Sequence, residues 1–362
     1  MKVIQIIDRL EYGGAERVFV DICNLLNDNS IEVTALFTRE PGPMSNELNS
    51  NIPKISLRRK FKYSIIAMLK LLKVSKDYDI IHVHSRHNLL YTLSVFLIFR
   101  FRNYPIIFHD HFGSIDINKT VPFYFKKKWF KNKFFYIGVC EELVDWAVKD
   151  VNLDYKRCQN LPNIRIIHKK NKNILPISNN KIKIIRVGNI HPVKNLEFAI
   201  YLLYEINKDL HSELTICGSL SDMKYFKKLK NIIKSLSLED NVIFIHNETD
   251  IPSILSNYDL GISCSLSESG PLVLIEYLNS GIPFLTYKTG EVVKQISSRH
   301  PEMIMNDFEI NNWKKAFFGI LETRDESSLY SLKCTYRDLF SSEQYYNSLM
   351  EVYAKAQYTY YN

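Results

Sequence analysis

Two glutamates, Glu268 and Glu276, stand eight positions apart, and Gly270, Pro271 and an apolar run lie between them. Gly270 lets the backbone bend closely around a ligand, and Pro271 fits the first position of a helix, where its missing N–H costs nothing. The first N–H groups of a helix have no intrahelical acceptor, so the turn from Gly270 to Leu272 is a predicted anion site. One carboxylate can then face a sugar and the other a ribose, with a diphosphate bound at the helix start between them.

A bare pair of glutamates at this spacing also fits a solvated helix face. The surrounding elements favour a site instead. A strand is predicted over residues 260–264, the helix that carries Glu276 is predicted to end at Gly281, and another strand is predicted over residues 282–286. Glu268 therefore lies in the first loop of a strand–helix–strand unit.

This segment resembles the signature of the retaining glycosyltransferases of family 4, which have the GT-B fold. In that family two glutamates separated by seven residues are followed by a Gly-x-Pro turn, here Gly281-Ile282-Pro283. The resemblance implies transfer of a sugar from a nucleotide diphosphate sugar, with retention of the anomeric configuration and without a metal. It also implies that Glu276 accepts hydrogen bonds from the ribose hydroxyls. Glu268 would contact the donor sugar and stabilise the positive charge that develops on its ring.

A second loop with the same resemblance spans residues 188–195. Lys194 in this loop can neutralise a leaving diphosphate, whose negative charge grows as the glycosidic bond breaks. An ordinary surface lysine is the alternative. The family motif has an arginine where this chain has Asn189, so one positive charge is missing there unless Arg186 or Arg165 supplies it.

The first half of the chain carries two further candidates. Gly13 and Gly14 directly follow the predicted first strand and let backbone N–H groups approach a phosphate or a sugar, with a simple tight turn as the alternative. The third glycine of a dinucleotide fingerprint is absent, which disfavours a nicotinamide enzyme. His109 ends a predicted strand, as does the family's histidine near the reacting sugar; a structural histidine is the alternative.

The predicted catalytic residues are therefore Glu268, His109 and Lys194. The predicted donor-binding residues are Gly13, Gly14, Asn189, Lys194, Gly270, Pro271, Leu272 and Glu276. No metal and no cofactor are expected besides the nucleotide diphosphate sugar itself.

A different enzyme class is suggested by His82 and His84. A His-x-His pair at a strand end, with His109 and His111 at another, has the residue types of a metal site and would fit a metallohydrolase. The order of elements disfavours that class, because the alternation of strands and helices restarts after a linker rather than running through eight units of a barrel.

Strand and helix patterns alternate along the chain, which predicts an α/β fold with parallel sheets. The length of 362 residues suits two domains. Together with the resemblance, this predicts two Rossmann-like domains facing a cleft. The expected parts are an acceptor-binding domain over residues 1–170, a linker over 171–181, a nucleotide-sugar-binding domain over 182–338, and a C-terminal helix over 339–362 that crosses back to the first domain.

The amino-acid composition predicts a cellular compartment and the charge of the binding partners. The scattered cysteines and the short apolar stretch at the N-terminus favour a cytoplasmic protein without a signal peptide. The formal net charge of +8 favours an acidic partner. Aromatic residues alternate with lysines in residues 121–135, which fits docking on anionic lipid, with a solvated helix face as the alternative. The lysines of this basic segment are Lys126, Lys127, Lys128, Lys131 and Lys133.

These observations predict a hexosyltransferase that uses a UDP- or GDP-sugar and a glycan or polyprenyl-linked acceptor in bacterial surface polysaccharide synthesis. It would act in the cytoplasm, with peripheral association with the inner face of the plasma membrane as a further hypothesis. No motif supports nucleic-acid binding. A nucleotide-sugar epimerase or hydrolase of the same fold remains open, as does a non-catalytic partner subunit, which the change at Asn189 would fit.

Overall fold

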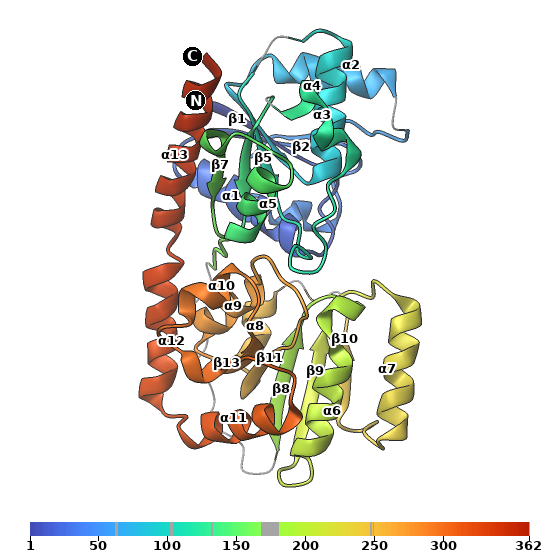
Figure 1. The fold of residues 1–362 in the computed structure, drawn as a ribbon, viewed down its shortest axis with the longest axis vertical. Coiled ribbons are helices and arrows are strands. Elements are labelled where there is room, and N and C mark those ends of the chain that lie inside the picture. The colour runs from blue at the N-terminus through green and yellow to red at the C-terminus, as the bar shows by residue number, and fades with distance from the viewer. Residues whose placement is uncertain are drawn as a thin grey trace. The chain divides into compact units, whose positions relative to one another are not determined.

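A computed structural model describes residues 1–61, 64–101, 104–131, 133–167, 181–246, 248 and 250–361. The chain forms two α/β units (Figure 1). The first unit consists of residues 1–164 together with 342–362, and the second consists of residues 165–341. Each unit has its own parallel sheet and its own apolar core.

The sheet of the first unit has seven parallel strands in the order β3-β2-β1-β4-β5-β6-β7. Its inner strands β4 and β5 are buried along their length, as expected for a parallel sheet with both faces covered, and they begin with apolar residues and end with polar ones. The strands are β1 (Lys2–Ile7), β2 (Glu32–Phe37), β3 (Lys54–Ser56), β4 (Ile80–His84), β5 (Ile106–Asp110), β6 (Phe135–Gly138) and β7 (Cys158–Asn160). The helices of residues 1–164 are α1 (Gly14–Asp28), α2 (Ile65–Ser75), α3 (Arg86–Ile98), α4 (Lys128–Lys131) and α5 (Glu141–Lys149).

The sheet of the second unit has six parallel strands in the order β10-β9-β8-β11-β12-β13. Its strands are β8 (Ile182–Val187), β9 (Ser212–Cys217), β10 (Val242–Ile245), β11 (Leu260–Ser263), β12 (Phe284–Tyr287) and β13 (Ile304–Met305). Its helices are α6 (Leu196–Ile206), α7 (Met223–Ser235), α8 (Ile251–Leu255), α9 (Leu272–Ser280), α10 (Glu291–Ile296), α11 (Ile310–Glu322) and α12 (Glu326–Leu339). Short 3-10 turns are η1 (Pro43–Glu47), η2 (Phe123–Lys126), η3 (Tyr155–Arg157), η4 (Pro192–Lys194) and η5 (Pro301–Met303).

The last helix, α13 (Ser342–Tyr361), belongs to the first unit, so the chain returns there at its end (Figure 1). Leu349, Val352 and Tyr353 of this helix are fully buried. The predicted return of the C-terminal helix is therefore confirmed. The change of unit falls between residues 341 and 342, whereas 339 was expected, because α12 continues to Leu339.

Three further expectations can be compared with the described chain. Residues 165–167 group with the second unit, although residues up to 170 were assigned to the first, and residues 168–180 of the expected boundary and linker lie outside the described residues. Of the six cysteines, only Cys334 is not buried. In the described part of the chain, no helix combines the length and the apolar character that crossing a bilayer requires.

The strand order places a crevice at one point of each sheet. In the first sheet the order reverses between β1 and β4, and in the second between β8 and β11. Connections leave neighbouring strands in opposite directions at such a point, and ligands of open α/β sheets bind at the carboxyl ends of those strands. The loops after these four strands are therefore the ones that can position a site.

Candidate active site

The loops that follow β8 and β11 bring two of the three predicted catalytic residues together. Lys194, at the end of η4, donates from Nζ to Glu268 Oε1 at 2.5 Å. Ser265 Oγ donates to the same carboxylate oxygen at 2.7 Å. The predicted lysine and the predicted acid thus form one ion pair at the point where the strand order of the second sheet reverses.

A second cation lies behind this pair. Arg186, in β8, is only 1% exposed, and its guanidinium donates to Ser265 Oγ at 3.0 Å. It also donates to the backbone carbonyl of Val187 and to that of Lys194, the latter at 3.4 Å. Arg186 therefore holds both the serine that binds Glu268 and the turn that carries Lys194. Asn189, the position of the expected arginine, is half-buried in the same loop.

These neighbours decide the charge of Glu268. Burial alone would raise the pKa of this carboxyl, because a low-dielectric site disfavours the ion. The charge of Lys194, the hydrogen bonds from Lys194 and Ser265, and the charge of Arg186 outweigh burial and lower the pKa below its ordinary value. Glu268 is therefore ionised at neutral pH.

The Glu268 loop is fixed from the opposite side by the turn before α10. Thr289 Oγ1 accepts from the backbone N–H of Glu268 at 3.0 Å, and the backbone N–H of Glu291 donates to the Ser269 carbonyl at 2.9 Å. Gly290 has a φ of +88°, and a Cβ there would lie 2.7 Å from Cδ of Pro271. Only glycine adopts that conformation easily and leaves room for the proline ring.

Helix α9 begins at Leu272 and ends at Gly281, whose φ of +72° is the left-handed conformation typical of a glycine after a helix. The predicted end is confirmed. The predicted place of Pro271 as the first helical residue was wrong by one position, because the structure has Pro271 with extended ψ just before the helix. The N–H groups of the first turn still lack intrahelical acceptors, so Gly270, Pro271 and Leu272 remain the predicted anion site.

Glu276 lies on α9, which follows the loop that carries Glu268, and it pairs with a different cation. Arg165 Nε donates to Glu276 Oε1 at 2.7 Å, and both side chains are 8% exposed. Tyr336 Oη donates to the backbone carbonyl of Arg165 at 3.2 Å. The two arginines considered as replacements for the missing charge thus lie at the two carboxylates, with Arg186 near Glu268 and Arg165 on Glu276.

In the first unit, Gly13 and Gly14 are at the start of α1, in the loop that follows β1. Gly13 has an extended backbone that any residue can adopt, but the carboxylate of Glu16 occupies the space of a Cβ there. Gly14 is exposed. Both glycines lie near the carboxyl end of β1, where their donor-binding role remains a prediction.

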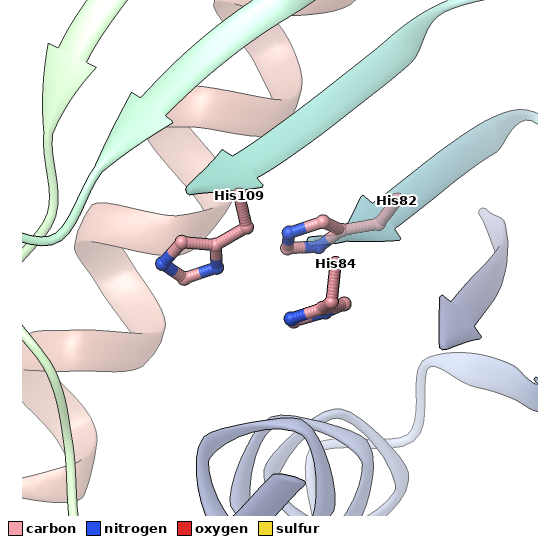
Figure 2. Close-up of side chains that lie close together, drawn as sticks. All are labelled: His82, His84 and His109. Atoms are coloured by element: carbon pink, nitrogen blue, oxygen red, sulfur yellow. The ribbon is translucent and has the colours of Figure 1, made fainter. Parts of the chain in front are cut away.

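The third predicted catalytic residue, His109, belongs to a cluster of buried histidines at the ends of β4 and β5. His84 and His109 are register partners on these two parallel strands, and Figure 2 shows them beside His82. The ring of His109 stacks on His111 with centroids 4.2 Å apart, and the ring of His82 stacks on His84 at 4.6 Å. His109 belongs to the first unit, whereas Glu268 and Lys194 belong to the second.

Hydrogen bonds connect most of this cluster to the C-terminal helix. His84 Nε2 lies 2.8 Å from Gln5 Oε1, and Gln5 Nε2 donates to Tyr353 Oη at 2.9 Å. Tyr353 Oη also lies 2.9 Å from His82 Nδ1. Sequence reasoning missed Gln5 and Tyr353, because no local pattern links the first strand to a helix almost at the end of the chain.

Burial keeps these histidines neutral. It lowers the pKa of His82 and of His111 to about 3, and those of His84 and His109 well below their ordinary value. Among the described residues, neither ring nitrogen of His109 has a hydrogen-bond partner. Fully buried His109 therefore has one N–H donor and one acceptor that no described residue uses at neutral pH.

The same histidines are the candidates for a metal in the described part of the chain. One nitrogen each from His82, His84 and His109 lies within 4.8 Å of the others. A tetrahedral zinc site with bonds of about 2.1 Å needs nitrogens roughly 3.4 Å apart. His84 already uses both ring nitrogens, toward Gln5 and His111. A metal would have to displace one of these hydrogen bonds of His84, so a hydrogen-bonded structural cluster fits the arrangement better.

Comparison with known proteins identifies the family. The model of "Glycosyltransferase Family 4" matches residues 12–159, and the model of "Glycosyl transferases group 1" matches residues 168–328. The chain is a glycosyltransferase of the family 4 type. The two matches fall on the two units and include both glutamates, Lys194 and His109. This assignment replaces the metallohydrolase alternative built on His82 and His84.

Two relatives show the range of similarity. This glycosyltransferase is 27% identical over 302 residues to an Escherichia coli protein named UDP-Gal:alpha-D-GlcNAc-diphosphoundecaprenol alpha-1,3-galactosyltransferase, with 75% of each chain covered. It is 23% identical over 345 residues to an uncharacterized glycosyltransferase of Haemophilus influenzae, with 92% of each chain covered.

Solved structures confirm the fold. Anabaena HepE, crystallised with UDP and glucose, matches with a TM-score of 0.80 at 16% identity over 98% of this chain and 99% of that one. The apo form of the lipopolysaccharide outer core galactosyltransferase WaaB matches with a TM-score of 0.65 at 14% identity over 97% and 99% of the two chains. The predicted GT-B fold, with two Rossmann-like α/β domains, is therefore confirmed.

Proposed function

We propose that this glycosyltransferase moves a hexose from a UDP-sugar to a hydroxyl of a lipid-linked glycan, with retention of the anomeric configuration. The observation that carries the proposal is the ion pair of Lys194 and Glu268 where the strand order of the second sheet reverses. The names of the E. coli relative and of the HepE complex support a UDP donor, and the former supports a diphosphate-lipid acceptor. Such an acceptor fits bacterial surface polysaccharide synthesis.

Lys194 and the start of α9 would hold the diphosphate. A bound diphosphate competes with Glu268 for the Lys194 ammonium, because both are anions within its reach. The backbone N–H groups of the first turn of α9, which begins at Leu272, add partial positive charge at the helix start. As the bond between the anomeric carbon and the diphosphate breaks, these groups stabilise the growing charge on the leaving group, and no metal is required in this proposal.

Glu268 would face the reacting sugar. When Lys194 turns to the diphosphate, the carboxylate keeps its hydrogen bond from Ser265 and the nearby charge of Arg186, so it stays ionised. An ionised carboxylate accepts hydrogen bonds from sugar hydroxyls and stabilises positive charge on the ring. A new bond then forms from the anomeric carbon to the acceptor oxygen on the face that the diphosphate leaves, and the proton of the acceptor hydroxyl passes to an oxygen of the departing diphosphate.

The remaining predicted residues would orient the two substrates. Glu276 has acceptor sites beyond the oxygen that binds Arg165, and these are proposed for the ribose hydroxyls. Neutral His109 would donate to or accept from a hydroxyl of the donor sugar or the acceptor. Asn189, Gly13 and Gly14 would add backbone and amide contacts to the donor. In this proposal the donor binds mainly to the second unit and the acceptor to the first.

The basic segment bears on where the enzyme works. We propose that it attracts the chain to the anionic inner face of the plasma membrane, where a lipid-linked acceptor resides. Lys126, Lys127 and Lys133 are exposed and Lys131 is half-buried, while the side chain of Lys128 lies outside the described residues. Each lysine near an anionic surface adds roughly 1 kcal/mol of attraction.

The direct test is a transfer assay with purified full-length protein. UDP- and GDP-sugars are offered with N-acetylglucosaminyl diphosphoundecaprenol, and NMR assigns the anomeric configuration of the product. We expect transfer from a UDP-hexose with retention, and Glu268→Gln should lower kcat by at least about 100-fold, as removal of one charge-stabilising group does elsewhere.

Glu322→Gln, at an exposed position on α11, is the matched control and should keep wild-type activity. Full activity of Glu268→Gln or an inverted product would contradict the proposal. Turnover of the UDP-sugar without any acceptor would instead favour the epimerase or hydrolase. No turnover and no thermal stabilisation by any nucleotide sugar would favour a partner subunit.

A further inference from the structure

A cavity of about 200 Å³ opens in the first unit, away from the carboxyl ends of its strands. Its walls come mainly from the second half of α3 and the chain that follows: Phe96, Leu97, Phe101 and Tyr104. Trp129 of α4 closes another side. The ring of Phe101 is tilted against that of Phe96, with centroids 4.8 Å apart, and stacks on that of Tyr104 at 5.1 Å. This wall offers carbon surface to a ligand and few hydrogen-bonding groups.

Two cations complete the lining of the cavity, Arg100 and Lys133. Both are exposed, and among the described residues neither side chain has an ion-pair or hydrogen-bond partner. Arg100 directly follows the α3 C-cap with a φ of +48°, in a left-handed conformation that glycine adopts more easily. An arginine therefore occupies a position where the backbone conformation favours glycine. Its charged side chain is available to bind a ligand.

The mouth of the cavity is apolar as well as basic. Leu97 and Trp129 of the cavity lining are 52% and 37% exposed, and Ile98 and Phe99, which follow Leu97 in the chain, are 58% and 39% exposed. The basic segment runs along the same part of the unit, since Trp129 and Lys133 belong to it. Exposed apolar side chains beside cations fit an anionic lipid surface. The hydrocarbon chains of the lipid would contact the apolar side chains, and the lipid phosphates would contact the cations.

The position of the cavity shows that it is not the predicted sugar-binding site. The cavity includes Ile106, the first residue of β5, whereas His109 and the other candidate residues follow the carboxyl ends of strands. A nucleotide or a free sugar would also leave its hydroxyl groups without partners against this aromatic wall.

We propose that this cavity receives the hydrocarbon chain of an anionic membrane lipid, whose phosphate binds Arg100 and Lys133. The inference deepens the proposed membrane location and rests on it. Beyond a general attraction between lysines and a charged surface, it assigns one lipid a specific binding site at the end of α3, which we call the lipid seat.

Trp129 makes the seat observable. The other two tryptophans, Trp146 and Trp313, are buried at 1% and 0% exposure, so Trp129 is the tryptophan that bound lipid can reach. Full-length protein is mixed with phosphatidylcholine vesicles containing phosphatidylglycerol with brominated acyl chains. We expect quenching of tryptophan emission, a shift to shorter wavelength, and loss of both changes in Trp129→Phe. Brominated phosphatidylcholine alone should quench little.

A pair of arginine-to-glycine variants separates the seat from simple charge attraction. Arg100→Gly removes one cation at a position whose backbone suits glycine. Arg58→Gly removes one cation at an exposed position with a φ of +51°, also in the first unit, and gives the same net charge. We expect Arg100→Gly to weaken binding to phosphatidylglycerol vesicles several-fold more than Arg58→Gly, with Trp129 quenching lost in parallel.

Equal losses in the two variants, or vesicle binding without quenching of Trp129, would overturn the lipid seat while leaving the proposed membrane location intact. Absence of vesicle binding would overturn both. Neither outcome touches the transfer assay, which tests the proposed reaction separately with the donor and a detergent-dispersed acceptor.

Discussion

At the scale of residues, each of the two carboxylates is held by a buried arginine that comes from elsewhere in the chain. Arg186 reaches Glu268 through Ser265, and Arg165 binds Glu276 directly. Arg186 contacts Ser265 and the turn that carries Lys194, so we assign it the role of a positioning residue. Its charge is one of the influences that lower the pKa of Glu268.

Replacing Arg186 should therefore change how activity depends on pH. Arg186→Met removes an influence that lowers the pKa of Glu268, so that pKa rises. The acid limb of kcat/KM should then move to higher pH, since Glu268 must be ionised. Arg186→Lys should restore part of the shift, and Arg299→Met, at an exposed ion pair with Asp338, should leave the profile unchanged. An acid limb that stays in place in Arg186→Met would refute this role.

The candidate residues differ in how far the sequence could predict them. Glu268, Glu276 and Lys194 were recognised because each lies in a short motif directly after a predicted strand. The sequence suggested Arg186 and Arg165 as sources of charge without assigning them to a carboxylate. Their partners lie 79 and 111 positions away, and only the packed sheet brings them together.

At the scale of elements, the Glu268 loop depends on the turn before α10. Gly290→Ala would combine an unfavourable φ with a contact between its Cβ and the Pro271 ring. We expect a loss of at least about 1 kcal/mol. This corresponds to a fall in melting temperature of roughly 2–4 °C. Because the anion site would shift, we also expect a higher KM for the donor.

Gly319→Ala on α11 is the matched control for this substitution. No atom lies within 4 Å of a Cβ there, and alanine favours a helix interior over glycine by up to about 1 kcal/mol. The melting temperature should therefore rise slightly, with KM unchanged. A Gly290→Ala protein as stable and as active as Gly319→Ala would show that the loop tolerates the side chain.

The elements themselves were largely predictable. The strand and helix patterns of the sequence also predict a strand over 182–187 and helices over 141–149 and 223–235, and these coincide with β8, α5 and α7; the strand predicted over 260–264 extends one residue beyond β11. These segments have strong apolar periodicity. The short edge strands β3, β7 and β13 were missed, because two or three residues carry no periodic pattern and form strands only by pairing with a neighbour.

At the scale of the whole molecule, the end of the chain completes the core of the first unit. Tyr353 on α13 supplies a hydroxyl to Gln5 and to His82, and through Gln5 it supports His84. The resemblance implied the return of the last helix. The contact with the histidine cluster could not be predicted, because it joins residues 271 positions apart.

The buried cluster predicts how stability depends on pH. Histidines that are neutral when folded, with pKa values of about 3 for His82 and His111, bind protons near pH 6.5 once the chain unfolds. The free energy of unfolding therefore has its full value above about pH 6.5. It falls as the pH decreases toward 3, by about 1 kcal/mol per pH unit for each such histidine.

Melting temperatures measured from pH 7.5 to 4 test this expectation. The slope should become shallower in His82→Gln and stay unchanged in His211→Gln, whose side chain is exposed. A wild-type melting temperature that is flat over this range would contradict the burial of neutral histidines.

The central claim is that Lys194, at the point where β8 and β11 diverge, binds the diphosphate of a nucleotide sugar. Calorimetric titration of UDP and UMP into wild-type protein, Lys194→Met and the exposed control Lys208→Met measures the contribution of Lys194 to this affinity directly. A charge-assisted hydrogen bond is worth about 1.5–3 kcal/mol, so wild type and Lys208→Met should bind UDP at least about tenfold more tightly than UMP. Lys194→Met should lose most of that preference. The same preference for UDP in Lys194→Met as in wild type, or no UDP binding to wild type, would contradict the account.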